Sequence, residues 1–303
     1  MSGHRRGTDA VPAWSLAVAA GISVQLGSAL SVHLIASVGA GGTAWLRLTA
    51  GAVIFVAIAR PRLHSLRRQD APLLLLLGIT TGLQTVAFLA AIARIPLGTS
   101  VAIEFLGPMT VAALHSRSRG AMAWVGAAGV GVVLVTQPWR GEIDWTGVVF
   151  AGLAAVGWAV YIVLTQRVGD RFSGLSGLAF TTPIAACVAA VFGIPQAAGH
   201  LTVGVVAAGI GLAVLLPVLP FSFELLALRR MTPTAFGTLM ALEPAFGVVI
   251  GLTVLHQRLS PLQVAGIILV VLAGVAAQRG EGDRPAPAGD AADRQPGPGA
   301  VPF

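Results

Sequence analysis

The chain has 303 residues, of which 55% are hydrophobic and only 10% are charged. Its mean hydropathy is +0.84, and so little polar surface excludes a water-soluble globule and indicates a protein that lies in lipid. The formal net charge of +7 would suit a nucleic-acid-binding domain. Here, however, the arginines are spread thinly over short loops, so we expect no nucleic-acid partner.

A helix needs about 20 mostly apolar residues to cross a hydrocarbon layer of about 30 Å. Ten apolar segments approach or reach this length, and none shows the alternation of a β-strand. The sequence therefore predicts an all-α membrane protein with ten transmembrane helices, whose partner is the lipid bilayer. In chain order the predicted spans are Ala13 to Leu34, Gly42 to Ala59, Ala71 to Ile92, Pro96 to Leu114, Ala121 to Val135, Trp145 to Leu164, Leu175 to Ile194, Val203 to Leu228, Thr232 to Leu255 and Leu262 to Ala277.

The arginines predict the orientation of these spans, because positively charged loops stay in the cytoplasm. Alternate loops and the two ends carry fifteen of the 19 arginines, whereas the other loops carry only Arg94, Arg140 and Arg258. We therefore expect both termini to be cytoplasmic. The fifteen are Arg5, Arg6, Arg60, Arg62, Arg67, Arg68, Arg117, Arg119, Arg167, Arg171, Arg229, Arg230, Arg279, Arg284 and Arg294.

The two ends of the chain differ from the apolar middle. Residues 1–12 are expected to be a cytoplasmic N-terminus, although Arg5 and Arg6 before an apolar run would also suit a cleaved secretory signal. Nine spans follow, which favours a retained first helix. Residues 279–303 are rich in Gly, Pro, Ala and Asp and are expected to be a disordered cytoplasmic tail. The single cysteine, Cys187, excludes a disulfide framework, and no metal site or other cofactor is predicted.

The spans form two similar sets of five. Sliding the second half over the first by 136 positions lays Pro244 on Pro108 and Arg230 on Arg94. Five is an odd number, so the second set must enter the membrane from the opposite side. We therefore predict two inverted five-helix repeats, at residues 13–138 and 139–278, an architecture that exposes a central site to alternate faces of the membrane.

Two runs resemble the paired signatures of the drug/metabolite transporter superfamily with two EamA-type domains. They are RIPLGTSVAIEFLGP, at residues 94–108, and TPTAFGTLMALEPA, at residues 232–245. Within the superfamily these runs are most similar to the threonine and homoserine exporters. The resemblance covers roughly residues 13–278 and implies a ten-helix inner-membrane protein that exports small metabolites. The chain departs from many members at His256-Gln257-Arg258, where those members carry a Gly-Glu pair.

Four ionisable residues lie within the apolar spans: Arg47, Glu104, Glu224 and Glu243. A charge in lipid costs about 2.5–3.5 kcal/mol on insertion scales, so each should face the bundle interior or a wet cavity. At about 1.5 Å per residue, Glu243 lies roughly 16 Å from the cytoplasmic edge and Glu104 about 12 Å from the outer edge. Both acids are candidates for a substrate or proton pathway. An ion pair between Arg47 and Glu104 is the structural alternative for those two residues, and a protonated carboxyl bonded to another helix is the alternative for Glu243.

Prolines mark the predicted helix breaks. Pro108 and Pro244 have no N–H, so the carbonyls four residues earlier lose their helical partners and become available to a ligand or water. Pro217 and Pro220 should break the eighth span as a hinge. Near its end, Glu224 is expected to lie at the surface as a snorkelling partner of neighbouring arginines.

Three neutral polar residues, Gln25, Gln84 and Tyr161, interrupt otherwise apolar helices and are weaker candidates for binding a substrate. Polar side chains in a bundle also serve to join helices. Gly247 with Gly251, and Gly126 with Gly129, are expected to be close-packing faces.

The leading hypothesis is a secondary transporter that exports small neutral metabolites by alternating access, with threonine- or homoserine-like amino acids as substrates. Proton antiport through Glu104 or Glu243 is a further hypothesis. The first alternative is an exporter of drugs, purines or aromatic compounds, against which the scarcity of aromatic residues argues. The second is an intramembrane enzyme, but the chain has no phosphate-binding loop, hydrolase motif or His/Cys cluster. The sequence makes no prediction of oligomeric state.

Overall fold

The computed structural model describes residues 12–61, 66–116, 119–141, 143–169, 171–172, 175–228 and 230–282. Throughout these ranges the regular structure is helical, and no strand occurs. Most of the two predicted cytoplasmic ends, residues 1–12 and 279–303, lies outside the described residues. The last helix continues to Gly282, so the first four residues of the predicted tail, 279–282, are helical.

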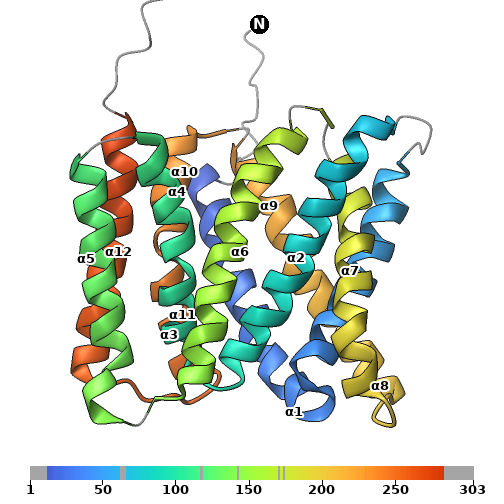
Figure 1. Ribbon diagram of the computed structural model, residues 1–303, viewed down its shortest axis with the longest axis horizontal. Helices are drawn as coiled ribbons and strands as arrows, with labels where there is room; N and C mark the ends of the chain where they lie inside the picture. Colours follow the sequence, from blue (N-terminus) through green and yellow to red (C-terminus); the bar gives the residue numbers. More distant parts are fainter. Residues whose placement is uncertain are drawn as a thin grey trace, which may run out of the picture.

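The helices run roughly parallel to one another in a single bundle (Figure 1). Short 3₁₀ turns, η2 (Arg68–Asp70) and η3 (Pro138–Arg140), and a π-helical turn, η4 (Val214–Val218), connect or interrupt them. The α-helices are α1 (Ala13–Ala59), α2 (Ala71–Ile92), α3 (Leu97–Glu104), α4 (Leu106–Ser116), α5 (Arg119–Thr136), α6 (Trp145–Gly169), α7 (Ser176–Ala197), α8 (Val203–Ala213), α9 (Leu219–Leu228), α10 (Pro233–Met240), α11 (Glu243–Thr253) and α12 (Pro261–Gly282).

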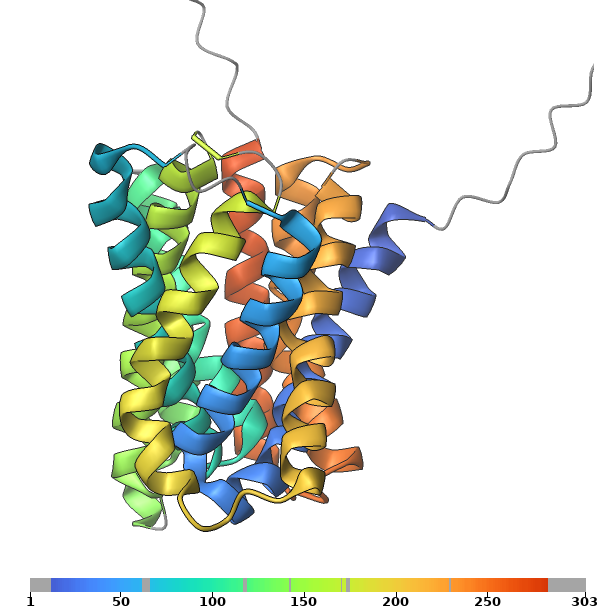
Figure 2. The same cartoon turned by 90° about the vertical axis from the view of Figure 1, so that its right-hand side faces the viewer.

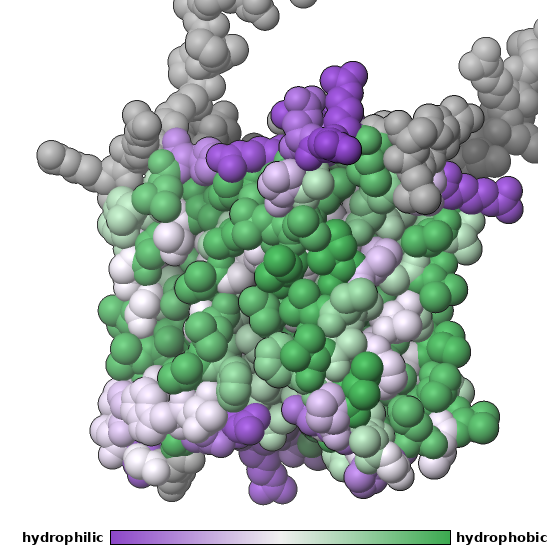
Figure 3. Space-filling view, turned by 45° about the vertical axis from the view of Figure 1, so that its right-hand side comes forward, coloured by the Kyte–Doolittle hydropathy of each residue, from purple (hydrophilic) through white to green (hydrophobic). Residues whose placement is uncertain are grey.

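The bundle presents an apolar belt between two polar ends (Figure 3). Eight helical stretches of the described chain are long and apolar enough to cross a bilayer, and Pro261–Ala277 is a shorter apolar helix. Large apolar side chains such as Val156 and Val191 are 63% and 70% exposed within this belt, which water would disfavour but lipid tolerates. The chain is therefore a multi-pass membrane protein.

Helix α1 reverses direction at Gly39. Its 47 residues would make about 70 Å of helix, far more than the roughly 30 Å of hydrocarbon. Gly39 has φ +73° and ψ 170°, a conformation that is open only to glycine. The two arms, residues 13–38 and 40–59, run in opposite directions through the bundle (Figure 2). The sequence predicted a loop between residues 35 and 41, but helix occupies all of it except this one residue.

Three predicted spans are each divided into two helices. The fourth becomes α3 and α4, which separate at Phe105, and the ninth becomes α10 and α11, which separate at Ala241 and Leu242. The eighth becomes α8 and α9, joined by η4, in which Leu216 has φ −158° and is not helical. Each division lies within the span, so the backbone there is irregular inside the bundle.

Glycines allow the two halves of the chain to pack tightly. A Cβ on Gly98 would lie 2.7 Å from Val248 Cγ2, and one on Gly247 would lie 3.2 Å from Val101 Cγ2. These contacts join α3 of the first half to α11 of the second. The predicted packing role of Gly247 is therefore visible in the structure.

Helices α5 and α12 also pack through glycine, but not through the pair that the sequence suggested. A Cβ on Gly131 would lie 2.7 Å from the carbonyl oxygen of Gly266, whereas Gly126 and Gly129 have nothing within 4 Å. The expectation of a close-packing face at Gly126 and Gly129 is wrong. They lie on the same helix, but on a face with open space around it.

The loops alternate between the two ends of the bundle. The junctions of α1 with α2, α4 with α5, α6 with α7 and α9 with α10 lie at the end where the described chain begins (Figure 1). These are the arginine-rich junctions, and Arg171 there forms an ion pair with Asp70 of η2. We refer to this as the arginine-rich end. The junctions of α2 with α3, α5 with α6, α7 with α8 and α11 with α12 lie at the opposite end.

Candidate functional site

A cavity of about 430 Å³ lies in the centre of the bundle, within the range of roughly 300–1,000 Å³ that holds small ligands. Helices α1, α2, α3, α4, α6, α9, α10 and α11 and the π-helical turn η4 contribute to its wall. All six predicted polar candidates and three of the four predicted prolines line it. They are Gln25, Arg47, Gln84, Glu104, Tyr161 and Glu243, with Pro108, Pro217 and Pro220.

Glu104 lies at the break in the fourth span. It is the last residue of α3, and Pro108 in α4 cannot donate a hydrogen bond back to its carbonyl. The side chain is 8% exposed, and Gln84 Nε2 donates a hydrogen bond of 3.3 Å to its Oε1. The carboxylate is therefore buried, partly satisfied by protein and turned to the cavity.

Glu243 lies at the break in the ninth span, in the second half of the chain. It is the first residue of α11, directly after the break, and Pro244 follows it. Its side chain is buried, as is Pro244, which lies beside the cavity without lining it. Met240, whose carbonyl Pro244 cannot satisfy, is another lining residue. Glu243 and Met240 thus both line the cavity at the break, beside the proline that cannot donate a hydrogen bond.

Arg47 is buried on the second arm of α1, with 4% exposure, and its Nε and Nη1 have no hydrogen-bond partner. Among the described residues no ion pair within 4.0 Å joins it to Glu104, because the pairs there are Arg94 with Asp144 and Arg171 with Asp70. The suggested Arg47–Glu104 ion pair is thus not formed in this conformation, although both side chains face one cavity.

The first arm of α1 adds further unpartnered polar groups to the same wall. Gln25 Oε1 and Ser28 Oγ are both buried without a hydrogen-bond partner, and both residues line the cavity. Ser23, two residues before Gln25, donates a 2.8 Å hydrogen bond to the carbonyl of Leu215, which fixes the arm against the π-helical turn. Ser28 was not singled out from the sequence, although it lies three residues after Gln25 and hence on the same helix face.

Tyr161 and Gln84 come from two helices that pack closely. A Cβ on Gly157 would lie 2.8 Å from Gln84 Cβ, so the glycine lets α6 approach α2 one turn before Tyr161. Glu224 of α9 also lines the cavity. The expectation that Glu224 lies at the surface is therefore wrong: four residues from the helix end is deep enough to reach the cavity.

Aromatic rings are concentrated at this cavity. Besides Tyr161, its lining includes Phe88, Phe105, Trp158, Phe221 and Phe236, and the rings of Phe105 and Trp158 pack edge to face with centroids 6.3 Å apart. The scarcity of aromatics in the whole chain was a poor guide, because the fold brings many of them to one place.

The cavity extends towards the arginine-rich end, where Glu224 and Phe236 line it close to the ends of α9 and α10. Towards the opposite end a hydrophobic cluster fills the bundle, with Leu89, Leu97 and Val101 at most 1% exposed. In this conformation the side chains therefore block a path from the cavity to the opposite end.

Polar contacts between the two halves hold that blocked end together. Gln196 Oε1 accepts a 2.8 Å hydrogen bond from the N–H of Gly41, and Gln257 Oε1 accepts a 3.0 Å bond from the N–H of Leu97. The amide of Gln257 thus joins α3 to the loop after α11.

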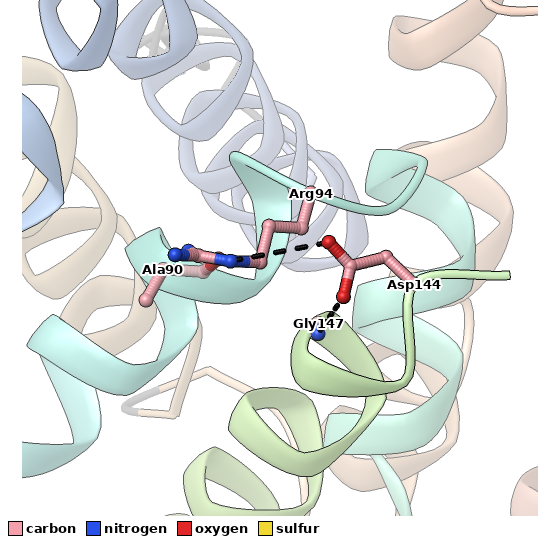
Figure 4. A network of polar contacts seen from close by, with 4 residues as sticks. All are labelled: Ala90, Arg94, Asp144 and Gly147. Atoms are coloured by element: carbon pink, nitrogen blue, oxygen red, sulfur yellow. Dashed lines mark hydrogen bonds and ion pairs between the residues drawn. The ribbon is translucent and has the colours of Figure 1, made fainter.

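Arg94 adds a third connection at the blocked end (Figure 4). Its Nη1 donates a 2.9 Å hydrogen bond to the carbonyl of Ala90, and its Nε lies 4.0 Å from Asp144 Oδ2. Asp144 in turn accepts a 3.1 Å bond from the N–H of Gly147 at the start of α6. These contacts join the end of α2 to the beginning of the second half.

A larger hollow of about 940 Å³ lies beside α2 and α6. Its wall is mainly apolar, and several of its lining residues, such as Leu153 and Val156, are more than half exposed within the lipid-facing belt. Of the six polar candidates, only Gln84 lines both this hollow and the central cavity. We therefore place the candidate site in the central cavity.

Comparison with known proteins agrees with this architecture. The chain is 35% identical over 257 residues to the threonine/homoserine exporter RhtA of Escherichia coli strain K12, covering 84% of this chain and 86% of that protein. The same values hold for RhtA of Salmonella typhimurium strain LT2. The chain belongs to the EamA-like transporter family. The model of this family matches residues 145–276, so its signature is recognised in the second half.

The fold of this EamA-like transporter is also similar to a solved crystal structure. The two superpose with a TM-score of 0.59 at 16% identity, over 87% of this chain and 97% of that one. At this identity the likeness concerns the fold alone. Since the relatives are exporters and the family is one of transporters, the chain is a transporter of a small-molecule substrate and not an enzyme.

Proposed function

We propose that this chain exports small neutral amino acids of the threonine and homoserine type across the bacterial inner membrane by alternating access. The central cavity is the substrate site. One observation carries the proposal: acidic, basic and amide side chains from distant parts of the chain converge on this single buried cavity. The 35% identity to exporters named for these two amino acids supports the substrate class.

The proposed architecture is ten crossings in two inverted repeats, at residues 13–138 and 139–278. The two arms of α1 and the shorter helix α12 complete the count, and the breaks at Phe105 and Ala241 are 136 positions apart, as are Pro108 and Pro244. With an even number of crossings, both termini lie on one side. The positive-inside rule makes the arginine-rich end cytoplasmic.

In this arrangement the cavity faces the cytoplasm and the blocked end faces outward. Export requires the reverse conformation, in which the contacts of Gln196 and Gln257 across the halves separate and the cytoplasmic side closes. The broken helices α3–α4 and α10–α11 are suited to this movement, because they carry both acids beside irregular backbone.

The proposal is tested by loading right-side-out membrane vesicles with labelled threonine or homoserine and measuring efflux. We expect vesicles that contain the protein to lose label at least about fivefold faster than vesicles without it, and unlabelled homoserine inside to compete. If the protein accelerates the efflux of neither threonine nor homoserine, the proposed substrate class is refuted.

The aromatic lining favours a second candidate, an exporter of aromatic or drug-like compounds, since rings stack well on such surfaces. The same vesicles loaded with a dye panel separate the two. Dye efflux without amino acid efflux would favour this second candidate.

A further inference from the structure

One wall of the central cavity carries polar groups that the protein itself leaves unpartnered. They are Arg47 Nε and Nη1, Gln25 Oε1 and Ser28 Oγ, and all three residues are at most 4% exposed. The two arms of α1 bring them together, since Gln25 and Ser28 lie on the first arm and Arg47 on the second.

Such groups are normally satisfied within a protein, because a buried donor without a partner costs the full free energy of its desolvation. Glu104 lines the same cavity but does not pair with Arg47 within 4.0 Å, and Gln84 holds its carboxylate instead. Two nitrogens of the Arg47 guanidinium are thus left without a hydrogen-bond partner, while one oxygen of Glu104 accepts from Gln84. A ligand that arrives and leaves during transport explains this arrangement.

The charges around the cavity indicate what kind of ligand fits. Among the described lining residues Arg47 is the one basic side chain, whereas Glu104, Glu224 and Glu243 are acidic. A guanidinium matches the planar, forked geometry of a carboxylate, and carboxylates match an ammonium group. The cavity is therefore complementary to a small molecule that carries both charges.

We propose that Arg47, assisted by Ser28, binds the α-carboxylate of a zwitterionic amino acid, while Glu104 and Glu243 bind its α-ammonium group. This assignment rests on the proposed function and deepens it. It makes Arg47 the residue that restricts the substrate to compounds with a free carboxylate. The alternative role of Arg47 is to balance the charge of the acids without touching substrate.

The two roles of Arg47 predict different binding affinities for ligands that lack one of the two charges. The purified protein in detergent is titrated with threonine and with threoninol, in which an alcohol replaces the carboxylate. We expect threoninol to bind at least about tenfold more weakly than threonine, the loss of one charge-assisted pair. Arg47→Gln should weaken threonine binding by a similar factor and leave threoninol binding within about twofold.

Arg167→Gln is the matched control, because Arg167 is exposed near the end of α6 and outside the cavity; it should bind both ligands as the wild type does. Equal binding of threonine and threoninol by the wild type would overturn the assignment, and so would an equal loss of both in Arg47→Gln. If Arg47→Gln does not fold, the wild-type ligand series and the milder Ser28→Ala decide the question. A wild type that binds neither compound refutes the proposed function itself.

Discussion

The side chains around the central cavity divide between those held by protein hydrogen bonds and those left without one. Gln84 holds Glu104, while Arg47 and Ser28 have buried atoms without partners. Glu243 is the first residue of α11 and is buried at the wall of the cavity. One carboxylate cannot hold a proton and pair with an ammonium group at the same time. Binding of one therefore displaces the other, which provides a simple basis for the exchange of protons for substrate.

We predict that Glu243→Gln uncouples export from the proton gradient. An amide keeps the shape of the side chain but cannot exchange a proton, so efflux driven by an imposed pH difference should fall at least tenfold. Exchange of labelled for unlabelled threonine at equal pH should fall less. Both rates are measured in proteoliposomes.

Asp144→Asn makes the same chemical change outside the cavity, at the blocked end (Figure 4), and should leave the response to pH intact. Glu104→Gln should retain a weaker response, because Gln84 already engages that carboxylate. Export unchanged by both Glu104→Gln and Glu243→Gln would rule out proton coupling through these acids.

Several residues that line the cavity could be predicted from the sequence, because a charged side chain inside an apolar span should face the bundle interior or a wet cavity. This argument found Arg47, Glu104 and Glu243. It missed Ser28, which looks unremarkable in sequence, and misplaced Glu224. Whether a residue near a helix end faces a cavity or the surface depends on neighbouring helices that sequence spacing does not reveal.

At the level of the helices, the reversal in α1 depends on both local and distant features. Gly39 is the residue with a conformation open only to glycine, and a Cβ there would lie 2.3 Å from Gln196 Oε1. The sequence around it predicted a turn but not its length. Gln196, at the end of α7, accepts a hydrogen bond from the N–H of Gly41 and so stabilises this one-residue turn.

We predict that Gly39→Ala destabilises the protein by about 2 kcal/mol or more, because the backbone conformation is strained for alanine and Gln196 must move. Thermal unfolding in detergent should show a midpoint lowered by several degrees. Gly126→Ala is the control. Gly126 is helical with nothing within 4 Å of the added Cβ, so its midpoint should not fall.

A second substitution separates the two causes. Gln196→Ala in the Gly39→Ala background removes the clash but not the backbone strain, so it should not restore the wild-type midpoint. An unchanged midpoint in Gly39→Ala alone would show that the arms of α1 can be joined in another way.

For the whole molecule, the sequence predicted two similar halves, and this division stays a prediction. It gave no indication of which helices of the two halves pack together. The arms of α1 pack along α7, and α5 packs along α12, so helices of the two halves pack directly against each other. Weak similarity between two apolar stretches carries no information about which helices touch. The contacts follow from glycines on facing helices, such as Gly131 and Gly266, whose partners are known only once the fold is known.

Alternating access predicts that a covalent link across the blocked end stops transport. Helices α3 and α11 belong to different halves, and a Cβ on Gly251 would lie 3.8 Å from Leu97 Cβ, a separation typical of disulfides. In a background in which alanine replaces Cys187, Leu97→Cys with Gly251→Cys should form a disulfide under oxidation. Threonine efflux should then fall at least tenfold and recover on reduction, because the outward-facing conformation needs these helices to separate. Each single-cysteine variant should respond to neither treatment. Full export by a protein shown to be cross-linked would mean that substrate leaves by a path that does not open between α3 and α11.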